Sequence, residues 1–229
     1  MSSRPSTDWS SIGRKTLMSL TGLILLSFVT FHMAGNLPLL KGAPGEYNTY
    51  AHLLTSLKVL LIAAEAMLAT CLLVHVWAAI RLLVNKRRAR PVKYEMYKSA
   101  GRESRKSVGA ATMLYTGFII FIFVALHLKT FKYGPMYTVT VDGAEIRDLH
   151  RLVVEVFSNG WVVLGYVVSM VILGFHLSHA FWSAFQSLGI WHLRYTPVLY
   201  CLGRVLAFLV AVGFMIPPVW IYFTGGVVQ

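Results

Sequence analysis

Charge is scarce in this chain of 229 residues, because Asp, Glu, Lys and Arg make up only 13% of it. A soluble domain carries about 25% charged residues, so the composition excludes an ordinary soluble fold. Acidic residues are the scarcest, since nine Asp and Glu stand against 21 Lys and Arg, a net charge of +12. The basic residues flank apolar runs, which is typical of membrane edges. We therefore expect a membrane protein and no nucleic-acid partner.

Cysteine is almost absent as well. Cys71 and Cys201 lie inside apolar runs, and neither belongs to a CxxCH motif. This excludes covalent attachment of a c-type haem. The sequence also has no CxxC cluster, nucleophile elbow or phosphate loop, so we predict no soluble catalytic centre and assign no catalytic residue.

Long apolar runs fill the chain instead, and 56% of its residues are hydrophobic. A run of about 20 apolar residues crosses a bilayer as a helix, because backbone groups in hydrocarbon must pair within their own segment. We predict an all-α integral membrane bundle of five transmembrane helices, forming a single domain over 1–229. The helices are expected at 14–40, 52–86, 106–131, 156–189 and 196–222.

The basic residues are distributed unevenly among the connections. Fifteen of the 21 Lys and Arg fall in the N-terminal tail, in 81–106, and between the fourth and fifth helices. Such an excess marks the cytoplasmic side, so we predict a basic cytoplasmic loop at 87–105. The N-terminus would then be cytoplasmic and the C-terminus outside. On the outer side, 129–158 is expected to form a hairpin around Asp142-Gly143 and a short surface helix. We identify no internal repeat.

The eight histidines are the most informative residues. Placing a histidine in a transmembrane helix costs free energy, so such a residue usually has a bonding partner or a functional role. A single one could simply hydrogen-bond a neighbouring helix. Because the histidines occur in four predicted helices, we favour haem, whose iron binds neutral imidazole. The histidines within the predicted spans are His32, His75, His127, His176 and His179.

Depth divides these histidines into two groups. His32 and His127 lie in the outer parts of the first and third predicted helices. His75, and one of His176 and His179, lie toward the cytoplasmic ends of the second and fourth. Two bis-histidine sites at different depths would form an electron path, whereas four histidines at one depth would indicate a metal cage. His176 and His179 are three residues apart on one helix face, so spacing does not choose between them.

Glu65 is the one charged residue in the apolar run 59–80. An acidic residue inside a membrane span can carry a proton or contact a quinone. Equally, its carboxylate can pair across helices, with Lys58, two turns earlier, as a candidate partner. The sequence leaves both interpretations open.

Five stretches of the chain resemble a known family. They are FVTFHMAGNL, LLVHVWAAIRL, IFVALHLKTFKYGP, IRDLHRLVVEVFSNGW and GFHLSHAFWSAFQSLG, and the last is the most specific. From about residue 14 to 215, the chain resembles the cytochrome b558 membrane subunit of succinate:quinone oxidoreductases and fumarate reductases. The resemblance is to the type with five helices and two haems.

The resemblance implies two haem b groups and their ligands. His32 and His127 would hold the outer haem, and His75 and His176 the inner haem. His179 would neighbour a haem or its propionate, and it is the second choice as a ligand. The resemblance also implies a flavoprotein subunit and an iron–sulfur subunit on the cytoplasmic face, where basic residues would suit docking and propionate pairing. The resemblance further implies a bacterial inner membrane, whose lipid would surround the helices, with ubiquinone or menaquinone as the substrate.

The function implied by the resemblance is electron transport between the iron–sulfur subunit and membrane quinone. The chain would be an enzyme subunit of succinate dehydrogenase, in the tricarboxylic acid cycle, or of fumarate reductase. Certain fumarate reductases carry a glutamate two residues before the haem histidine of the fourth helix, where this chain has Gly174. The alternatives are a cytochrome b anchor of a hydrogenase or formate dehydrogenase, and a haem-free transporter or structural anchor. A transporter should show broken helices near the membrane midplane.

Overall fold

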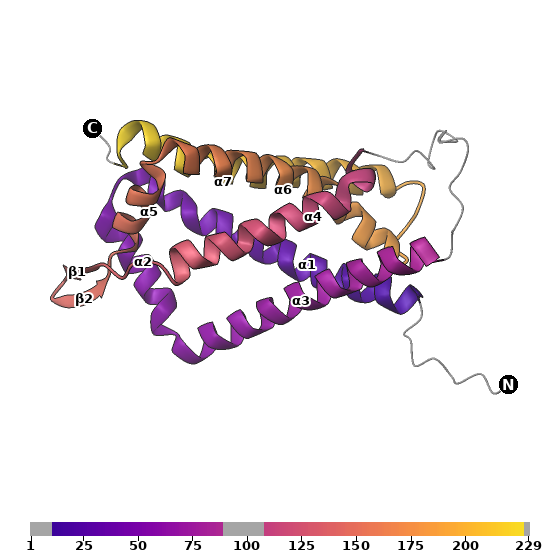
Figure 1. The fold of residues 1–229 in the computed structure, drawn as a ribbon, viewed down its shortest axis with the longest axis horizontal. Coiled ribbons are helices and arrows are strands. Elements are labelled where there is room, and N and C mark those ends of the chain that lie inside the picture. The colour runs from indigo at the N-terminus through magenta and orange to yellow at the C-terminus, as the bar shows by residue number, and fades with distance from the viewer. Residues whose placement is uncertain (1–10, 89–107, 227–229) are drawn as a thin grey trace.

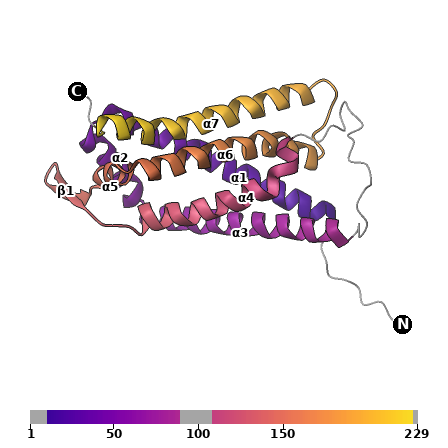
Figure 2. The same ribbon diagram turned by 45° about the horizontal axis from the view of Figure 1, so that its top comes forward.

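The computed structural model describes residues 11–88 and 108–226. These residues form seven α-helices and a two-stranded sheet (Figures 1 and 2), so the predicted all-α class is confirmed. The helices are α1 (Ser11–Asn36), α2 (Pro44–Ser56), α3 (Lys58–Arg88), α4 (Val108–His127), α5 (Leu149–Phe157), α6 (Gly160–Ser187) and α7 (Thr196–Thr224).

Five segments of the described chain are long and apolar enough to cross a membrane. Each has between 21 and 30 residues, which exceeds the roughly 20 that a bilayer requires. Large apolar side chains face outward from them, and Phe31, Val59 and Phe223 are 77%, 83% and 79% exposed. Soluble proteins rarely leave large apolar patches exposed. The chain is therefore a multi-pass membrane protein. The segments are Ile12–Lys41, Lys58–Asn85, Thr112–Lys132, Gly160–Ser187 and Thr196–Thr224.

The bundle has two distinct ends (Figure 1). At one end, here called the loop end, α1 begins, α3 ends, α4 begins and α6 connects to α7. At the opposite end, here called the hairpin end, lie α2, the strand pair and α5. Of the basic loop predicted at 87–105, Arg87 and Arg88 end α3, and the rest lies outside the described residues.

Helix α1 is central to the bundle because it packs against α3, α6 and α7. Helix α6 packs in turn against α4 and α7, whereas α3 does not pack along α4 or α6 within the described ranges. Close approach of α6 and α7 explains Gly174, since a Cβ there would lie 3.0 Å from the Cβ of Ala211. Small residues permit such contacts between membrane helices.

The prediction of one helix over 52–86 is wrong in its first part, because the structure divides this segment between α2 and α3. Leu57 has φ −77° and ψ 45°, outside the helical region, and it separates α2 from α3. Just before it, the hydroxyls of Thr55 and Ser56 donate to carbonyl oxygens three residues earlier. Such local bonds compete with the helical ladder. The spanning helix therefore begins at Lys58.

Two other predicted helices end in short elements of different geometry. The first, 14–40, contains α1 and a 3₁₀ turn over Leu37–Lys41, where Pro38 has no backbone N–H for an α-helical bond. The third, 106–131, contains α4 and then a π-helical turn over Leu128–Lys132.

The fourth predicted helix, 156–189, begins too early. Asn159 caps α6 by accepting a hydrogen bond from the backbone N–H of Trp161, so the residues before it belong to α5. An asparagine at this position stabilises a helix start. The fifth predicted helix, 196–222, agrees with α7 to within two residues.

The hairpin predicted around Asp142-Gly143 is confirmed. Strands β1 (Thr138–Val141) and β2 (Ala144–Arg147) pair antiparallel. The two residues between them have φ of 50° and 79°, and positive φ at both positions is what a type I′ turn requires. The predicted surface helix is α5, and Asp148 caps its N-terminus.

Asn48 ties α2 to α5 at the hairpin end. Its side chain is buried, with 1% of the residue exposed. Its Nδ2 donates to the Asp148 carboxylate at 2.8 Å, and its Oδ1 accepts from the backbone N–H of His150 at 2.9 Å. One side chain on α2 therefore satisfies two polar groups at the start of α5.

We expect Asn48→Ala to lower the free energy of unfolding by about 1–3 kcal/mol, because it leaves the buried N–H of His150 without a partner. Unfolding of the purified protein in mixed micelles, followed by circular dichroism, measures the change. The matched control is Thr49→Ala, since Thr49 is exposed and should matter by less than about 0.5 kcal/mol. Equal stability of the two variants would contradict the bridging role of Asn48.

Candidate functional site

Two histidines from different helices meet toward the hairpin end. His32 comes from α1 and His127 ends α4, and their ring centroids are 5.8 Å apart at an interplanar angle of 83°. This spacing is of the order of two metal–nitrogen bonds of about 2 Å each plus the radii of the rings. The pair, here called the outer pair, therefore suits one metal atom held between two imidazoles.

Aromatic side chains surround the outer pair. Phe28 stacks on His32 at 5.3 Å, and Phe123 stacks on His127 at 5.8 Å. The hydroxyl of Tyr166, on α6, lies 3.3 Å from Nδ1 of His127. Apolar and aromatic walls with a few placed polar groups are typical of cofactor sites.

A second pair, here called the inner pair, lies toward the loop end. His75 comes from α3 and His176 from α6, and both residues are partly buried. The described parts of α3 and α6 do not pack along one another. Instead, His75 lies against α1 and His176 lies against α4.

A threonine on a neighbouring helix contacts each ring of the inner pair. Thr21 Oγ1 lies 3.4 Å from Nδ1 of His75, which is also 3.0 Å from the carbonyl oxygen of Met18. Thr116 Oγ1 lies 3.0 Å from Nδ1 of His176. These contacts all use Nδ1, and no hydrogen bond to Nε2 of either ring occurs among the described residues.

A glycine follows each of these threonines and makes room for the ring. A Cβ at Gly22 would lie 3.1 Å from Cε1 of His75, and a Cβ at Gly117 would lie 3.4 Å from Cε1 of His176. A Cβ at Gly22 would therefore be tighter than an ordinary van der Waals contact, and one at Gly117 would just reach that contact. Each inner histidine therefore rests against a Thr-Gly step of the adjacent helix.

The two Thr-Gly steps are functional residues that the sequence analysis missed. Their spacing in the sequence could have revealed them, because Gly22 precedes His32 by ten residues and Gly117 precedes His127 by ten. The sequence therefore does contain an internal repeat, and the prediction that it has none is wrong. Helices α1 and α3 form one copy, and α4 and α6 form the other. Each copy supplies one histidine to the outer pair and one to the inner pair.

His179 lies one helical turn beyond His176 on α6. Its ring is edge-on to Trp182 at 6.3 Å, and Trp182 stacks on Tyr200 of α7 at 4.2 Å. The structure thus places His176 against α4, through Thr116, while His179 contacts an aromatic group that reaches α7.

The remaining three histidines lie outside both pairs. His52 and His192 are exposed. His150 is buried in α5, with 6% exposed, and within the described structure its Nε2 has no hydrogen-bond partner. Burial lowers the pKa of His150, so the ring is neutral at pH 7. Nearby, burial raises the pKa of Tyr47 to about 12, and its hydroxyl donates to Asn36 at 3.0 Å.

Glu65 forms an ion pair with Lys132. Lys132 belongs to the π-helical turn after α4, so the pair links α3 to α4. The carboxylate therefore does pair across helices, although Lys132 is its partner in place of Lys58. A role for Glu65 in proton transfer or quinone contact stays a prediction.

Arg14 is buried near the start of α1, with only 8% of the residue exposed. Its Nε has no hydrogen-bond partner within the described structure. A buried guanidinium N–H that lacks a partner is costly, so it indicates a bound acceptor such as an anion or a water molecule. Lys15, the next residue, is exposed at the same end.

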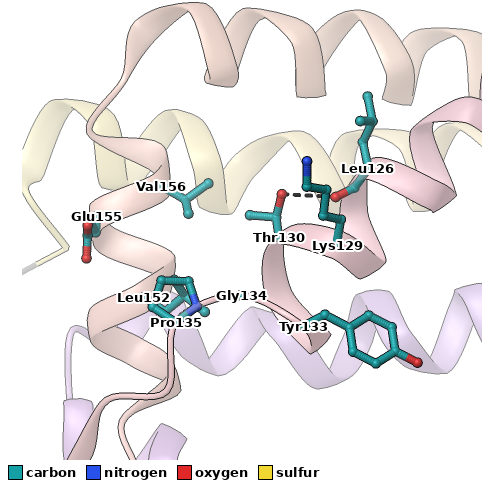
Figure 3. Close-up of a pocket in the computed structure, with 9 residues that line it drawn as sticks. All are labelled: Leu126, Lys129, Thr130, Tyr133, Gly134, Pro135, Leu152, Glu155 and Val156. Atoms are coloured by element: carbon teal, nitrogen blue, oxygen red, sulfur yellow. Dashed lines mark hydrogen bonds between the residues drawn. The ribbon is translucent and has the colours of Figure 1, made fainter.

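A hollow of about 460 Å³ opens at the hairpin end between the π-helical turn and α5 (Figure 3). None of the five membrane histidines lines it, so it is separate from both histidine pairs. Its lining residues are Leu126, Lys129, Thr130, Tyr133, Gly134, Pro135, Leu152, Glu155 and Val156.

Comparison with known proteins adds no family. No family model, no curated protein and no solved structure matches this chain. Within 11–88 and 108–226, no three His, Cys, Asp or Glu side chains gather in a geometry that could hold a metal ion. The functional argument therefore rests on the two pairs of imidazoles and their surroundings.

Proposed function

We propose that this chain is the di-haem cytochrome b anchor of a succinate dehydrogenase or fumarate reductase complex. The observation that carries the proposal is the arrangement of four membrane histidines. The rings of His32 and His127, from α1 and α4, lie 5.8 Å apart. His75 and His176, from α3 and α6, each lie against a Thr-Gly step of α1 or α4. Haem iron accepts imidazole on both faces, and the core of a helix bundle holds such cofactors. A single membrane histidine can serve as a hydrogen-bond donor between helices, but that role does not require matched pairs.

The pairs lie at different depths. Gly22 lies against His75, and His32 is ten residues further along the same helix. Gly117 lies against His176, and the same ten residues separate it from His127. At about 1.5 Å per residue, the two pairs are about 15 Å apart along the bundle. Two haems with this separation would conduct electrons across much of the roughly 30 Å hydrocarbon core.

The residues around the pairs fit haem. The inner histidines use Nδ1 for contacts with the protein, which leaves Nε2 for iron. At the outer pair, Phe28 and Phe123 add flat aromatic walls. Arg14, with its unpaired Nε, is placed to bind a carboxylate such as a haem propionate at the loop end.

When bound, haem supplies one-electron transfer through its iron. The protein's own contribution is to fix the ligands and to keep water away from the path. The histidines set the position of each haem, and Thr21, Thr116 and Tyr166 orient three of the four rings. Leu26, Met170 and Leu173 belong to the apolar core that excludes water around the path.

We infer that the loop end faces the cytoplasm, because basic residues mark the cytoplasmic side of membrane proteins. The flavoprotein and iron–sulfur subunits would dock there, next to the inner haem, and membrane quinone would exchange electrons with a haem inside the bilayer. The basic residues described at this end are Arg14, Lys15, Arg81, Arg87, Arg88, Arg194 and Arg204.

Continuous helices argue against a transporter. Transporters typically bind their substrates at broken helices near the midplane. Here α3, α4 and α6 run unbroken through their apolar segments, and the prolines inside α7 are Pro217 and Pro218, close to its end.

Isolation of the tagged chain from mildly solubilised native membranes tests the proposal. The expected complex contains flavin and iron–sulfur clusters, and it reduces quinone with succinate or fumarate with quinol. The matched control is the His75→Ala complex, which should still oxidise succinate with a soluble dye but should lose quinone reduction. A complex that oxidises hydrogen or formate instead, or one with no succinate or fumarate activity, would refute the proposal.

A further inference from the structure

We propose that the two Thr-Gly steps are positioning elements that lock the tautomer of the inner haem ligands. Thr116 would lock His176 and Thr21 would lock His75, each with the proton on Nδ1 and the lone pair of Nε2 directed to iron. The inference rests on the proposed haem function and goes beyond it, because it assigns a task to residues that are not ligands.

The hydrogen bonds of Thr116 determine which atom donates to which. Its hydroxyl lies 3.1 Å from the carbonyl oxygen of Thr112 and 3.2 Å from that of Met113. A carbonyl oxygen can only accept, so both carbonyl contacts form hydrogen bonds only when the Thr116 hydroxyl donates to its own helix. In that arrangement its oxygen, 3.0 Å from Nδ1 of His176, accepts from the ring. This is the arrangement proposed here, with the His176 proton on Nδ1.

Thr21 repeats this arrangement on α1. Its hydroxyl donates to the carbonyl oxygen of Leu17 at 2.8 Å, with that of Met18 at 3.1 Å. The Met18 carbonyl also lies 3.0 Å from Nδ1 of His75 and can only accept from it. Because the Met18 carbonyl can only accept, His75 is also protonated on Nδ1.

The two locks are unequal. Nδ1 of His75 has two acceptors, the carbonyl oxygen of Met18 at 3.0 Å and Thr21 at 3.4 Å. Nδ1 of His176 has one acceptor among the described residues, Thr116 at 3.0 Å. Loss of the Thr116 hydroxyl thus removes the one acceptor described for Nδ1 of His176. Loss of the Thr21 hydroxyl leaves His75 its closer acceptor, the carbonyl oxygen of Met18.

The glycines complete each step. Gly22 and Gly117 let the imidazoles lie close enough to the helix backbone for these bonds to form. The outer pair is built differently, because Nδ1 of His127 contacts the Tyr166 hydroxyl on another helix. The Thr-Gly steps therefore serve the inner haem alone.

A hydrogen bond donated by Nδ1 makes the imidazole a more basic ligand. A more basic ligand favours ferric over ferrous iron and so lowers the midpoint potential of the haem. Without the acceptor, the ring can also populate the tautomer with its proton on Nε2, and Nε2 then has no lone pair for the iron. Removing the lock should therefore raise the potential and weaken haem binding.

The test compares Thr116→Val, Thr116→Ser and Thr21→Val in the complex purified from membranes. Haem content, redox titration of each haem and the electron paramagnetic resonance of the ferric state are measured. We expect Thr116→Val to raise the midpoint potential of the inner haem and to weaken its binding by about 10- to 100-fold. Thr116→Ser should restore both values, and Thr21→Val should give a smaller shift. The outer haem should not change.

Thr70→Val is the matched control, because the Thr70 hydroxyl donates to the carbonyl oxygen four residues earlier on α3 and contacts no histidine. Unchanged potential and haem retention in Thr116→Val would overturn the tautomer lock. A larger effect in Thr21→Val than in Thr116→Val, or a failure of Thr116→Ser to restore the potential, would overturn it as well. Absence of haem from the unmodified complex would instead refute the proposed function, so the two failures are distinguishable.

Discussion

Replacing His32 or His127 with alanine should remove one of the two haems and leave the other. The two rings are 5.8 Å apart and come from α1 and α4, so either substitution deletes one of the two ligands proposed for the outer haem. Haem content should fall from about two to about one per chain in both variants. Pyridine haemochromogen spectra measure the content, and redox titration identifies the haem that remains.

The controls for this prediction are His52→Ala and His192→Ala. Both residues are exposed and lie outside the two pairs, so these variants should retain both haems. If His32→Ala and His127→Ala removed different haems, the outer pair would be misassigned.

The second large effect separates His176 from its neighbour on α6. His176→Ala should remove the inner haem, whereas His179→Ala should retain both haems. The reason is geometric, because His176 contacts Thr116 of α4 through Nδ1, whereas the His179 ring lies edge-on to Trp182. Haem content and the reduced-minus-oxidised spectrum of each variant show which haem the variant retains.

His75→Ala serves as the reference for this comparison, because it should remove the same haem as His176→Ala. If His179→Ala lost the inner haem and His176→Ala retained it, the ligand on α6 would be His179. The Thr116 contact would then have no role in haem binding.

The spanning helices could be predicted from the sequence because they depend on bulk properties. Low charge and apolar runs of sufficient length decide that a segment crosses a membrane, whatever its neighbours are. The hairpin at Asp142-Gly143 was predictable for a local reason, since few residue pairs adopt positive φ at both turn positions.

The elements that the sequence did not predict depend on contacts between distant segments. The break at Leu57 is not marked by proline or glycine, and it places α2 where Asn48 can bind Asp148 and His150 on α5. The π-helical turn after His127 likewise carries Lys132 to Glu65 on α3. Neither partner lies near in the sequence, so local patterns could not identify them.

For the candidate site, the sequence placed the histidines at two depths but gave no account of what orients them. The Thr-Gly steps are ordinary dipeptides in a transmembrane helix, and only the structure shows that Gly22 and Gly117 lie against inner histidines. Partners that lie 54 and 60 residues from their histidines have no local signature.

The most direct test of the di-haem account is a haem count per chain in the purified complex, with a reduced-minus-oxidised spectrum and a redox titration. The account predicts about two non-covalent b-type haems per chain, with one midpoint potential for each. A chain that contains no haem would contradict the account, and a single haem would show that one of the two histidine pairs does not bind iron.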